Sequence, residues 1–285
     1  KVNFFGYYNI APDNSKGKII FNSTSLERKR ESTYSEADII VFDGLEYKKI
    51  AFSRSWNWQQ GCMLQWYDTN SIIFNDYEKG SYISKIISDK GDLLKSYSKP
   101  IYSLSVSMNY ALTLSFERLS EMRPDYGYFN KSDYELSDYD KDGIWKIDLK
   151  TGQEKLIISI KHLIGINYVD SMNNAKHKVN HIDINPSGKR FMFLHRWIGP
   201  KGRFTRLITS NYDGTDIYIL NGDTMTSHCC WINDDKILSF CYDESSNTAG
   251  YFYFSDKSSK VSFVSDEMPL SDGHPSLSPD GRYVI

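Results

Sequence analysis

The sequence predicts an all-β fold, a β-propeller of four-stranded blades that has seven blades when complete, and three observations support this. Three segments share one pattern, in which a histidine opens an apolar stretch that runs into a tight turn; they begin at His181, His228 and His274. These histidines lie 47 and 46 residues apart, a period typical of propeller blades. Between them, apolar and polar residues alternate and are bounded by Asp-Gly, Ser-Gly and Lys-Gly turns, which favours antiparallel hairpins.

The composition suits one globular domain over residues 1–285. Hydrophobic residues make up 40% and aromatic residues 15% of the chain, with 21 tyrosines. No apolar run approaches the roughly 18 residues that span a bilayer, so we expect no membrane partner. A formal net charge of −2 gives no electrostatic case for nucleic acid.

About five and a half blades are predicted along the chain. Their strands are expected at 8–13, 18–22 and 38–43; 62–66, 71–75 and 82–88; 101–105, 110–116 and 143–148; from His181, with 190–195 and 206–211; and from His228, with 236–241 and 251–255. Insertions at 117–142 and 162–180 interrupt this spacing of strands. The second is expected to include a short helix. Long loops of this kind tend to line one end of a propeller channel. We expect the domain to be truncated at its C-terminal end, because a sixth blade only begins before Ile285 and its edge would stay unpaired.

The four cysteines do not form the disulfide framework of a small secreted domain. Cys229 and Cys230 are neighbours on an expected strand and point to opposite faces, so they do not pair. Reduced, buried thiols favour the cytoplasm. A periplasmic location stays open because the sequence begins at Lys1 rather than Met.

The histidines that open the repeats are the first candidate site. A residue at one fixed point of each blade recurs around the propeller axis, so His181, His228 and His274 should converge. The alternative is structural, since a histidine at a blade start can bond a neighbouring blade and lock the turn, as in WD40 repeats.

Counting along the hairpins adds further groups to this candidate site. If Asn185 pairs with Phe191, then His195 lies opposite His181, and the same count places Cys241 opposite His228. Arg206 on the following strand adds a guanidinium. Imidazoles with a guanidinium suit the binding of a carboxylate, with or without a metal.

The segment 54–61 is the second candidate. If it is extended, Trp56 and Trp58 share one face, and the amide of Gln59 points the other way. Indole faces beside amide groups are what sugar rings bind, so we expect Trp56, Trp58, Gln59 and Gln60 to contact substrate, with Arg123 as a weaker candidate. The alternative is an aromatic cluster that packs one blade against the next.

A family resemblance covers Asn180 to Ile285. The matching features are the strand opened by His181, a strand with His195 and Trp197, a strand with Arg206, a blade start with His228 and Trp231, and a further blade start at His274. In this order and spacing the chain resembles the oligogalacturonate lyases, seven-bladed propellers related to the TolB-type repeats. It departs from their Arg-x-Trp motif, since Leu207 and Ile208 follow Arg206, and from their pattern at Cys229-Cys230.

The resemblance implies elimination across a uronate 4-linkage, with a manganese ion holding the carboxylate. It implies Arg206 and His228 at the proton-transfer site, with His181 and His195 nearby, and His274 as a metal ligand. A metal raises the acidity of the proton that a base then removes. Because arginine stays protonated, His228 competes with Arg206 for the role of base.

The expected function is therefore that of a metal-assisted β-eliminating lyase on a uronate-containing glycan, with a divalent cofactor such as Mn²⁺ and an oligosaccharide or polysaccharide substrate. The alternative is a non-catalytic propeller that binds a glycan or a protein partner. The sequence gives no indication of the oligomeric state.

Overall fold

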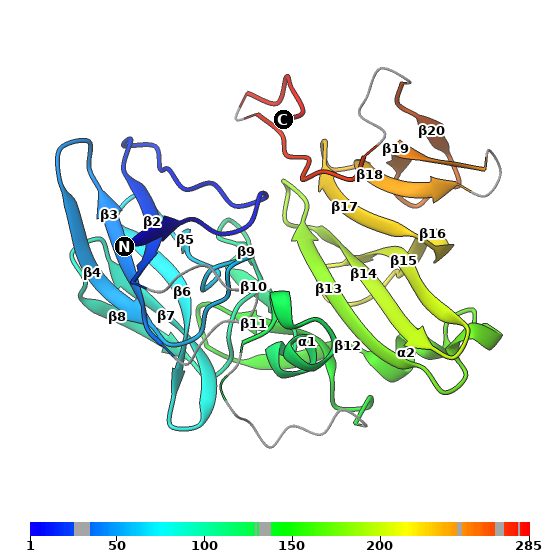
Figure 1. Ribbon diagram of the computed structural model, residues 1–285, viewed down its shortest axis with the longest axis horizontal. Helices are drawn as coiled ribbons and strands as arrows, with labels where there is room; N and C mark the ends of the chain where they lie inside the picture. Colours follow the sequence, from blue (N-terminus) through cyan, green and yellow to red (C-terminus); the bar gives the residue numbers. More distant parts are fainter. Residues whose placement is uncertain (26–34, 129, 131–137, 244–246, 266–270, 279) are drawn as a thin grey trace. The chain divides into compact units, whose positions relative to one another are not determined.

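The computed structural model describes residues 1–285 apart from 26–34, 129, 131–137, 244–246, 266–270 and 279. The described residues form five four-stranded antiparallel sheets, each built from strands that are consecutive in the chain (Figure 1). Sheets of this kind are the blades of a β-propeller, so the predicted fold class is confirmed.

The strands of each sheet follow one another in hydrogen-bonded order. Their bounds are β1 (Val2–Phe4), β2 (Ile19–Thr24), β3 (Ala37–Phe42) and β4 (Tyr47–Ser53); β5 (Gln65–Trp66), β6 (Ser71–Glu78), β7 (Ser81–Ser88) and β8 (Leu93–Tyr97); β9 (Ser103–Ser105), β10 (Tyr110–Thr113), β11 (Gly143–Asp148) and β12 (Glu154–Ser159); β13 (Lys176–Ile184), β14 (Arg190–Gly199), β15 (Gly202–Asn211) and β16 (Tyr218–Thr224); and β17 (Thr226–Trp231), β18 (Lys236–Asp243), β19 (Thr248–Ser255) and β20 (Val261–Phe263).

Short helices occupy the two insertions. The first contains α1 (Phe116–Met122) and the 3₁₀ turn η1 (Pro124–Tyr126), while most of the acidic stretch that follows lies outside the described residues. The second contains α2 (Ile160–Gly165) and η2 (Asp170–Met172). Its predicted end at residue 180 is wrong, because β13 already begins at Lys176. In the described part of the chain, no helix is long and apolar enough to cross a membrane.

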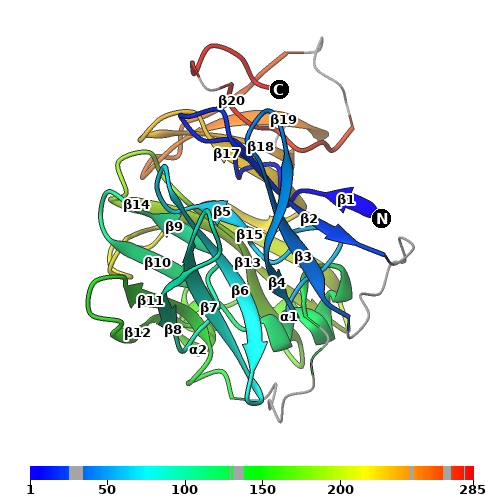
Figure 2. The same ribbon diagram turned by 90° about the vertical axis from the view of Figure 1, so that its left-hand side faces the viewer.

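The chain divides into two compact units. Unit 1 comprises Lys1–Val106, Tyr110–Asp138 and Ile147–Gln153, and unit 2 comprises Ser107–Asn109, Tyr139–Lys146 and Glu154–Ile285. In unit 1 the β1–β4 and β5–β8 sheets bury an apolar cluster with Ile39 and Phe74 (Figure 2). In unit 2 the β13–β16 and β17–β20 sheets bury another, with Leu194 and Trp231.

Alternation of apolar and polar residues explains how the sheets of unit 2 pack. Along β14, Met192 and Leu194 point to the same side of the sheet and enter the apolar cluster. Cys229 and Cys241 belong to the same cluster, and all four cysteines of the chain are buried with free thiols. The expectation of reduced, buried cysteines is confirmed for this structure.

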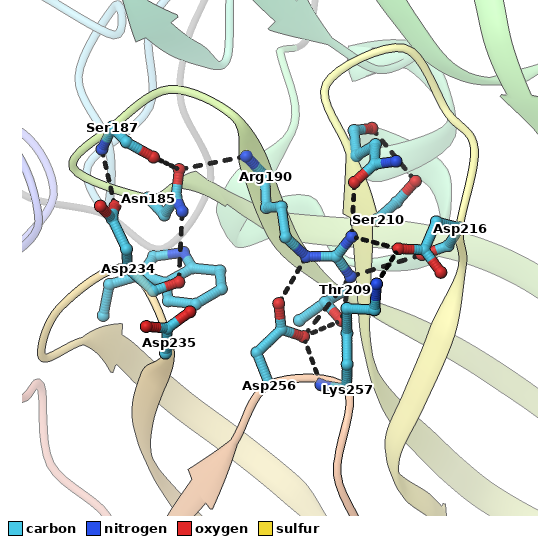
Figure 3. A network of polar contacts seen from close by, with 12 residues as sticks. Asn185, Ser187, Arg190, Thr209, Ser210, Asp216, Asp234, Asp235, Asp256 and Lys257 are labelled. Atoms are coloured by element: carbon cyan, nitrogen blue, oxygen red, sulfur yellow. Dashed lines mark hydrogen bonds and ion pairs between the residues drawn. The ribbon is translucent and has the colours of Figure 1, made fainter.

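A network of polar side chains also joins the two sheets of unit 2, and we call Arg190, Thr209 and Asp256 its clasp (Figure 3). Arg190 on β14 forms an ion pair with Asp256, which follows β19, and the Thr209 hydroxyl donates a 2.6 Å hydrogen bond to the same carboxylate. Nearby, the backbone N–H of Ser187 donates to Asp234, at 2.8 Å. The turns of the two sheets are therefore held together by charge-assisted bonds, of which those to Asp256 are partly buried and that to Asp234 is exposed.

Candidate functional site

A β-bulge in β13 places the first histidine of the repeats. The pairing with β14 runs to Asn180 and resumes at Asp183, so His181 and Ile182 together lie opposite Phe193. His181 adopts a left-handed conformation, with φ of 54°, which is uncommon for a residue other than glycine. A bulge adds a residue to one strand and redirects its side chain. The His181 imidazole is directed by this irregularity and not by regular alternation.

The first strand of the next sheet also carries a bulge. In β17 the pairing with β18 is interrupted between Thr226 and Cys229, so Ser227 and His228 lie opposite Phe240. Each bulge sets two residues against one and contains the histidine that opens its repeat. The two differ in detail, because His181 is the first residue of its bulge and has a positive φ, whereas His228 is the second residue of its bulge and does not.

The register predicted by hairpin counting is wrong by two residues in each hairpin. Phe191 pairs with Ile184 and not with Asn185, which accounts for one residue, and the bulge accounts for the other. His195 therefore lies opposite Val179 and not His181, and Cys241 lies opposite Thr226 and not His228. The sequence carries no signal for the bulges.

The three histidines that open the repeats nevertheless lie together. The rings of His181 and His228 are stacked, with centroids 5.4 Å apart, and His274 approaches His228 edge to face at 4.2 Å. We call these three residues the imidazole cluster. His181 is buried, the His228 side chain is 14% exposed, and His274 is exposed, so the cluster is open to solvent on one side.

The carboxylate of Asp272 completes the cluster. Its Oδ1 atom lies 2.9 Å from His228 Nδ1, and its Oδ2 atom accepts a 2.5 Å hydrogen bond from the Ser227 hydroxyl. Burial raises the pKa of Asp272, but these hydrogen bonds outweigh burial and hold the pKa below its ordinary value. Burial and the neighbouring His228 lower the pKa of His274. Near neutral pH the site therefore combines a carboxylate with a neutral His274.

The segment that carries Asp272 and His274 is anchored by a tyrosine. The hydroxyl of Tyr251 on β19 bonds the backbone of Gly273. A Cβ atom at Gly273 would lie 2.9 Å from that hydroxyl, so a larger residue would push the two apart. Sequence reasoning missed Asp272; its signal was the Asp-Gly turn directly before His274.

Arg206 is buried and is bound by other groups of the protein, none of which belongs to the imidazole cluster. It is 2% exposed, and its Nε atom donates to Asp223 at 2.6 Å. Its terminal nitrogens donate to the carbonyl oxygens of Ile166 and Asn167, at 2.7 and 2.6 Å. The guanidinium thus holds the connection after α2 against β15 and is engaged by protein groups.

His195 forms a buried pair with His177. His177 Nδ1 lies 3.0 Å from His195 Nε2, and both rings pack on Trp197. Both histidines are at most 1% exposed. Burial, His177 and Arg206 together hold the pKa of His195 well below its ordinary value. Within the described residues, the other ring nitrogen of His195 is buried without a hydrogen-bond partner.

In unit 1 the two tryptophans pack in the protein interior. Trp56 is 2% exposed, belongs to the apolar cluster, and donates from Nε1 to the carbonyl oxygen of Ser35 at 2.6 Å. Trp58 is half-buried and meets Trp56 edge to face, with ring centroids 5.0 Å apart. Phe4 packs against both rings. Aromatic packing, the alternative weighed from the sequence, describes this arrangement.

The amides beside these tryptophans belong to a closed turn and not to an extended strand. Asn57 Oδ1 accepts bonds from the backbone N–H groups of Gln59 and Gln60, at 3.0 and 2.7 Å. The Gln60 side chain is buried and donates to the Tyr102 hydroxyl at 2.9 Å. The guanidinium of Arg123 lies over the Tyr126 ring, 5.1 Å from its centroid.

The described residues give no support for the expected manganese centre. Across this part of the chain, no three His, Cys, Asp or Glu side chains are arranged to hold a metal ion. In the imidazole cluster, His228 Nδ1 is engaged by Asp272, and the rings of His228 and His274 pack against each other. Nothing in these residues supports His274 as a metal ligand.

Comparison with known proteins identifies the fold and no family. No family model matches the chain, and no curated protein matches it. Similar solved structures include TolB from Acinetobacter baumannii, at 16% identity and a TM-score of 0.44, with 87% of this chain and 53% of TolB covered. They also include a prolyl endopeptidase, at 11% identity and a TM-score of 0.54, with 95% of this chain and 39% of the endopeptidase covered.

A third similar structure is the propeller domain of the trilobed protease from Pyrococcus furiosus, at 11% identity and a TM-score of 0.47, with 87% of this chain and 66% of that chain covered. The chain thus spans about half the length of TolB and about two fifths of the endopeptidase. At these identities the likeness establishes a β-propeller fold, shared with TolB-like and other propeller proteins.

The expectation of a uronate lyase is wrong. The proteins of similar fold are TolB proteins and peptidases with a propeller domain, and they offer no evidence for a lyase or for glycan binding. The structure adds a physical reason, because the proposed proton-transfer residue Arg206 is buried and bound by Asp223 and two carbonyl groups.

Proposed function

We propose that this chain is a β-propeller domain that recognises polypeptide, and that the imidazole cluster with Asp272 is its recognition site. The observation that supports the proposal most directly is that His181 and His228 each lie in a bulge of the first strand of their sheet and stack their rings on each other. A left-handed histidine is strained, and strain of this kind concentrates at functional sites. Solvent reaches the cluster at His274 and at Asp272, whose side chain is 38% exposed.

Recognition suits this site better than covalent catalysis. The neighbouring hydroxyl, Ser227, donates a hydrogen bond to Asp272 and also lies 3.3 Å from His228 Nδ1. That nitrogen is itself engaged by Asp272, so it is poorly placed to take the proton of Ser227. Burial raises the pKa of the nearby Cys230 to about 12, so this thiol stays protonated near neutral pH. Among the described neighbours of His228, neither candidate nucleophile is activated.

Polypeptide is the ligand class that we favour for two reasons. Imidazole nitrogens and a carboxylate bind N–H groups, which every polypeptide presents along its backbone and at its amino terminus. In addition, a prolyl endopeptidase contains a domain of this fold, and its structural description links inter-domain dynamics to catalysis and specificity. In that protein the domain belongs to a peptidase.

A retention experiment tests the proposal. The immobilised protein is exposed to a tryptic digest of casein near neutral pH, and retained peptides are quantified by mass spectrometry. We expect wild type to retain peptides and His228→Gln to lose about tenfold or more, because a hydrogen bond to an ionisable group is removed. The matched control is His162→Gln, which replaces an exposed histidine on α2 and should behave as wild type. Equal retention by His228→Gln, or none by wild type, would overturn the proposal.

A further inference from the structure

The electrostatics of the imidazole cluster differ from those expected for a carboxylate-binding site. That expectation depended on the guanidinium of Arg206, whose Nε is paired with Asp223. The charged group that touches His228 is instead the carboxylate of Asp272. With the imidazoles neutral, the cluster carries the charge of this carboxylate.

Charged groups of both signs lie on the surrounding strands. On β13, Asp183 raises the pKa of the Cys229 thiol, as Asp272 also does, whereas Arg196 on β14 lowers it. The guanidinium of Arg196 donates to the carbonyl oxygen of Thr226, at 3.1 Å, and the buried Lys178 lies opposite Arg196 on β13. Among these groups, Asp272 is the one that bonds an imidazole of the cluster.

The other groups beside the cluster are uncharged. They are the Ser227 hydroxyl and the Cys230 thiol on β17, and the phenol of Tyr251 on β19. Burial raises the pKa values of Cys230 and Tyr251, so both stay neutral near pH 7. The charge in direct contact with the imidazoles is therefore that of the Asp272 carboxylate.

The hydrogen-bonding capacity of the cluster also favours a donor ligand. When His228 donates from Nδ1 to Asp272, its Nε2 atom is an acceptor. The Asp272 oxygens are acceptors as well, and both lie beside this imidazole. A primary ammonium group has three donors and a positive charge, and it matches these acceptors, whereas a ligand carboxylate would face the like charge of Asp272.

From this geometry we infer that the site captures a primary amine of its polypeptide ligand, either the α-ammonium group or a lysine side chain. The inference rests on the proposed function and specifies which group of the polypeptide is bound. Asp272 supplies the charge, and the His228 imidazole supplies an acceptor at Nε2 when it donates from Nδ1 to Asp272.

Chemical modification of the same casein digest tests the inference. One portion is acetylated, which removes the charge of α-amines and lysines, and another is methyl-esterified, which blocks carboxylates. We expect acetylation to reduce retention by about tenfold or more and esterification to leave it unchanged.

The outcomes separate the inference from the proposed function. If esterification abolishes retention and acetylation does not, or if neither matters, the amine assignment is overturned while polypeptide recognition stands. If no form of the digest is retained, the proposed function itself fails.

A variant pair assigns the effect to Asp272. Asp272→Asn should lose about tenfold or more of the amine-dependent retention while keeping its circular dichroism spectrum. Asp170→Asn is the control, since its side chain is 84% exposed on η2, and it should retain peptides as wild type does. Unchanged retention in Asp272→Asn would overturn the role of Asp272.

Discussion

His181 and His228 stack their imidazole rings with centroids 5.4 Å apart, and each lies in a bulge of the first strand of its sheet. Regular pairing alternates side chains between the two faces of a sheet. An extra residue in β13 and another in β17 break that alternation at the histidine of each repeat. The two stacked rings thus both come from irregular positions of their strands.

Backbone strain at His181 is the first testable consequence. With φ of 54°, His181 occupies a region that costs most residues about 1–2 kcal/mol relative to glycine. We expect His181→Gly to be more stable than His181→Ala by about 1 kcal/mol in urea unfolding, since both lack the imidazole and only alanine keeps the strain. Both variants should lose peptide retention. Equal stability of the two would show that the bulge relaxes when the imidazole is removed.

The clasp predicts a large stability effect far from the site. Arg190 is 11% and Asp256 is 4% exposed, so Arg190→Met would leave a buried carboxylate unpaired. Removal of one partner of a buried ion pair typically destabilises a protein by about 3 kcal/mol or more. Chemical denaturation followed by circular dichroism measures the loss.

Lys155→Met serves as the matched control for the clasp, because Lys155 is exposed on β12 in the same unit. It should change the free energy of unfolding by no more than about 0.5 kcal/mol. If Arg190→Met were equally mild, the clasp would not hold the two sheets together.

The buried pair of His177 and His195 predicts loss of stability in acid. The pKa of His195 is lowered in the folded state, so unfolded protein binds protons more readily below the ordinary histidine pKa of about 6.5. Above that pH, His195 is neutral in both states and folding carries no protonation penalty. As the pH falls toward the pKa of His195 in the folded protein, the unfolded state binds a proton that the folded state does not, and the free energy of unfolding decreases. One such proton changes the free energy of unfolding by at most about 1.4 kcal/mol per pH unit.

Unfolding curves between about pH 7.5 and pH 5 test this dependence. His195→Phe should be less sensitive to acid than wild type, whereas His162→Gln, at an exposed histidine, should retain the wild-type slope. An unchanged slope in His195→Phe would assign the acid sensitivity to other groups.

Much of the fold was predictable because its signals are local. Turns such as Asn185 to Arg190 form where the sequence places Pro-Ser-Gly, with the Asn185 N–H donating to the Arg190 carbonyl at 2.9 Å. Alternating apolar residues on either side of such turns mark the strands. Strand ends were less predictable: the β15 strand begins at Gly202, four residues before the predicted start at Arg206.

The candidate site was predictable only in part. The repeat identified His181, His228 and His274, and these residues lie together. Burial of Trp56 and engagement of Arg206 by Asp223 depend on residues distant in the chain, for which the sequence holds no periodic signal. The same holds for Asp272, which reaches His228 from beyond the last described sheet.

By itself, the sequence determined the blade architecture and the recurrence of one histidine per repeat, because hairpins and periodicity depend on neighbouring residues. Only the tertiary structure decided which groups accompany those histidines. A bulge shifts register at a point that no composition marks, and long-range contacts place a carboxylate beside His228 while they engage the guanidinium of Arg206 elsewhere. The sign of the charge at the site, and with it the kind of ligand group that it favours, is therefore a property of the folded chain.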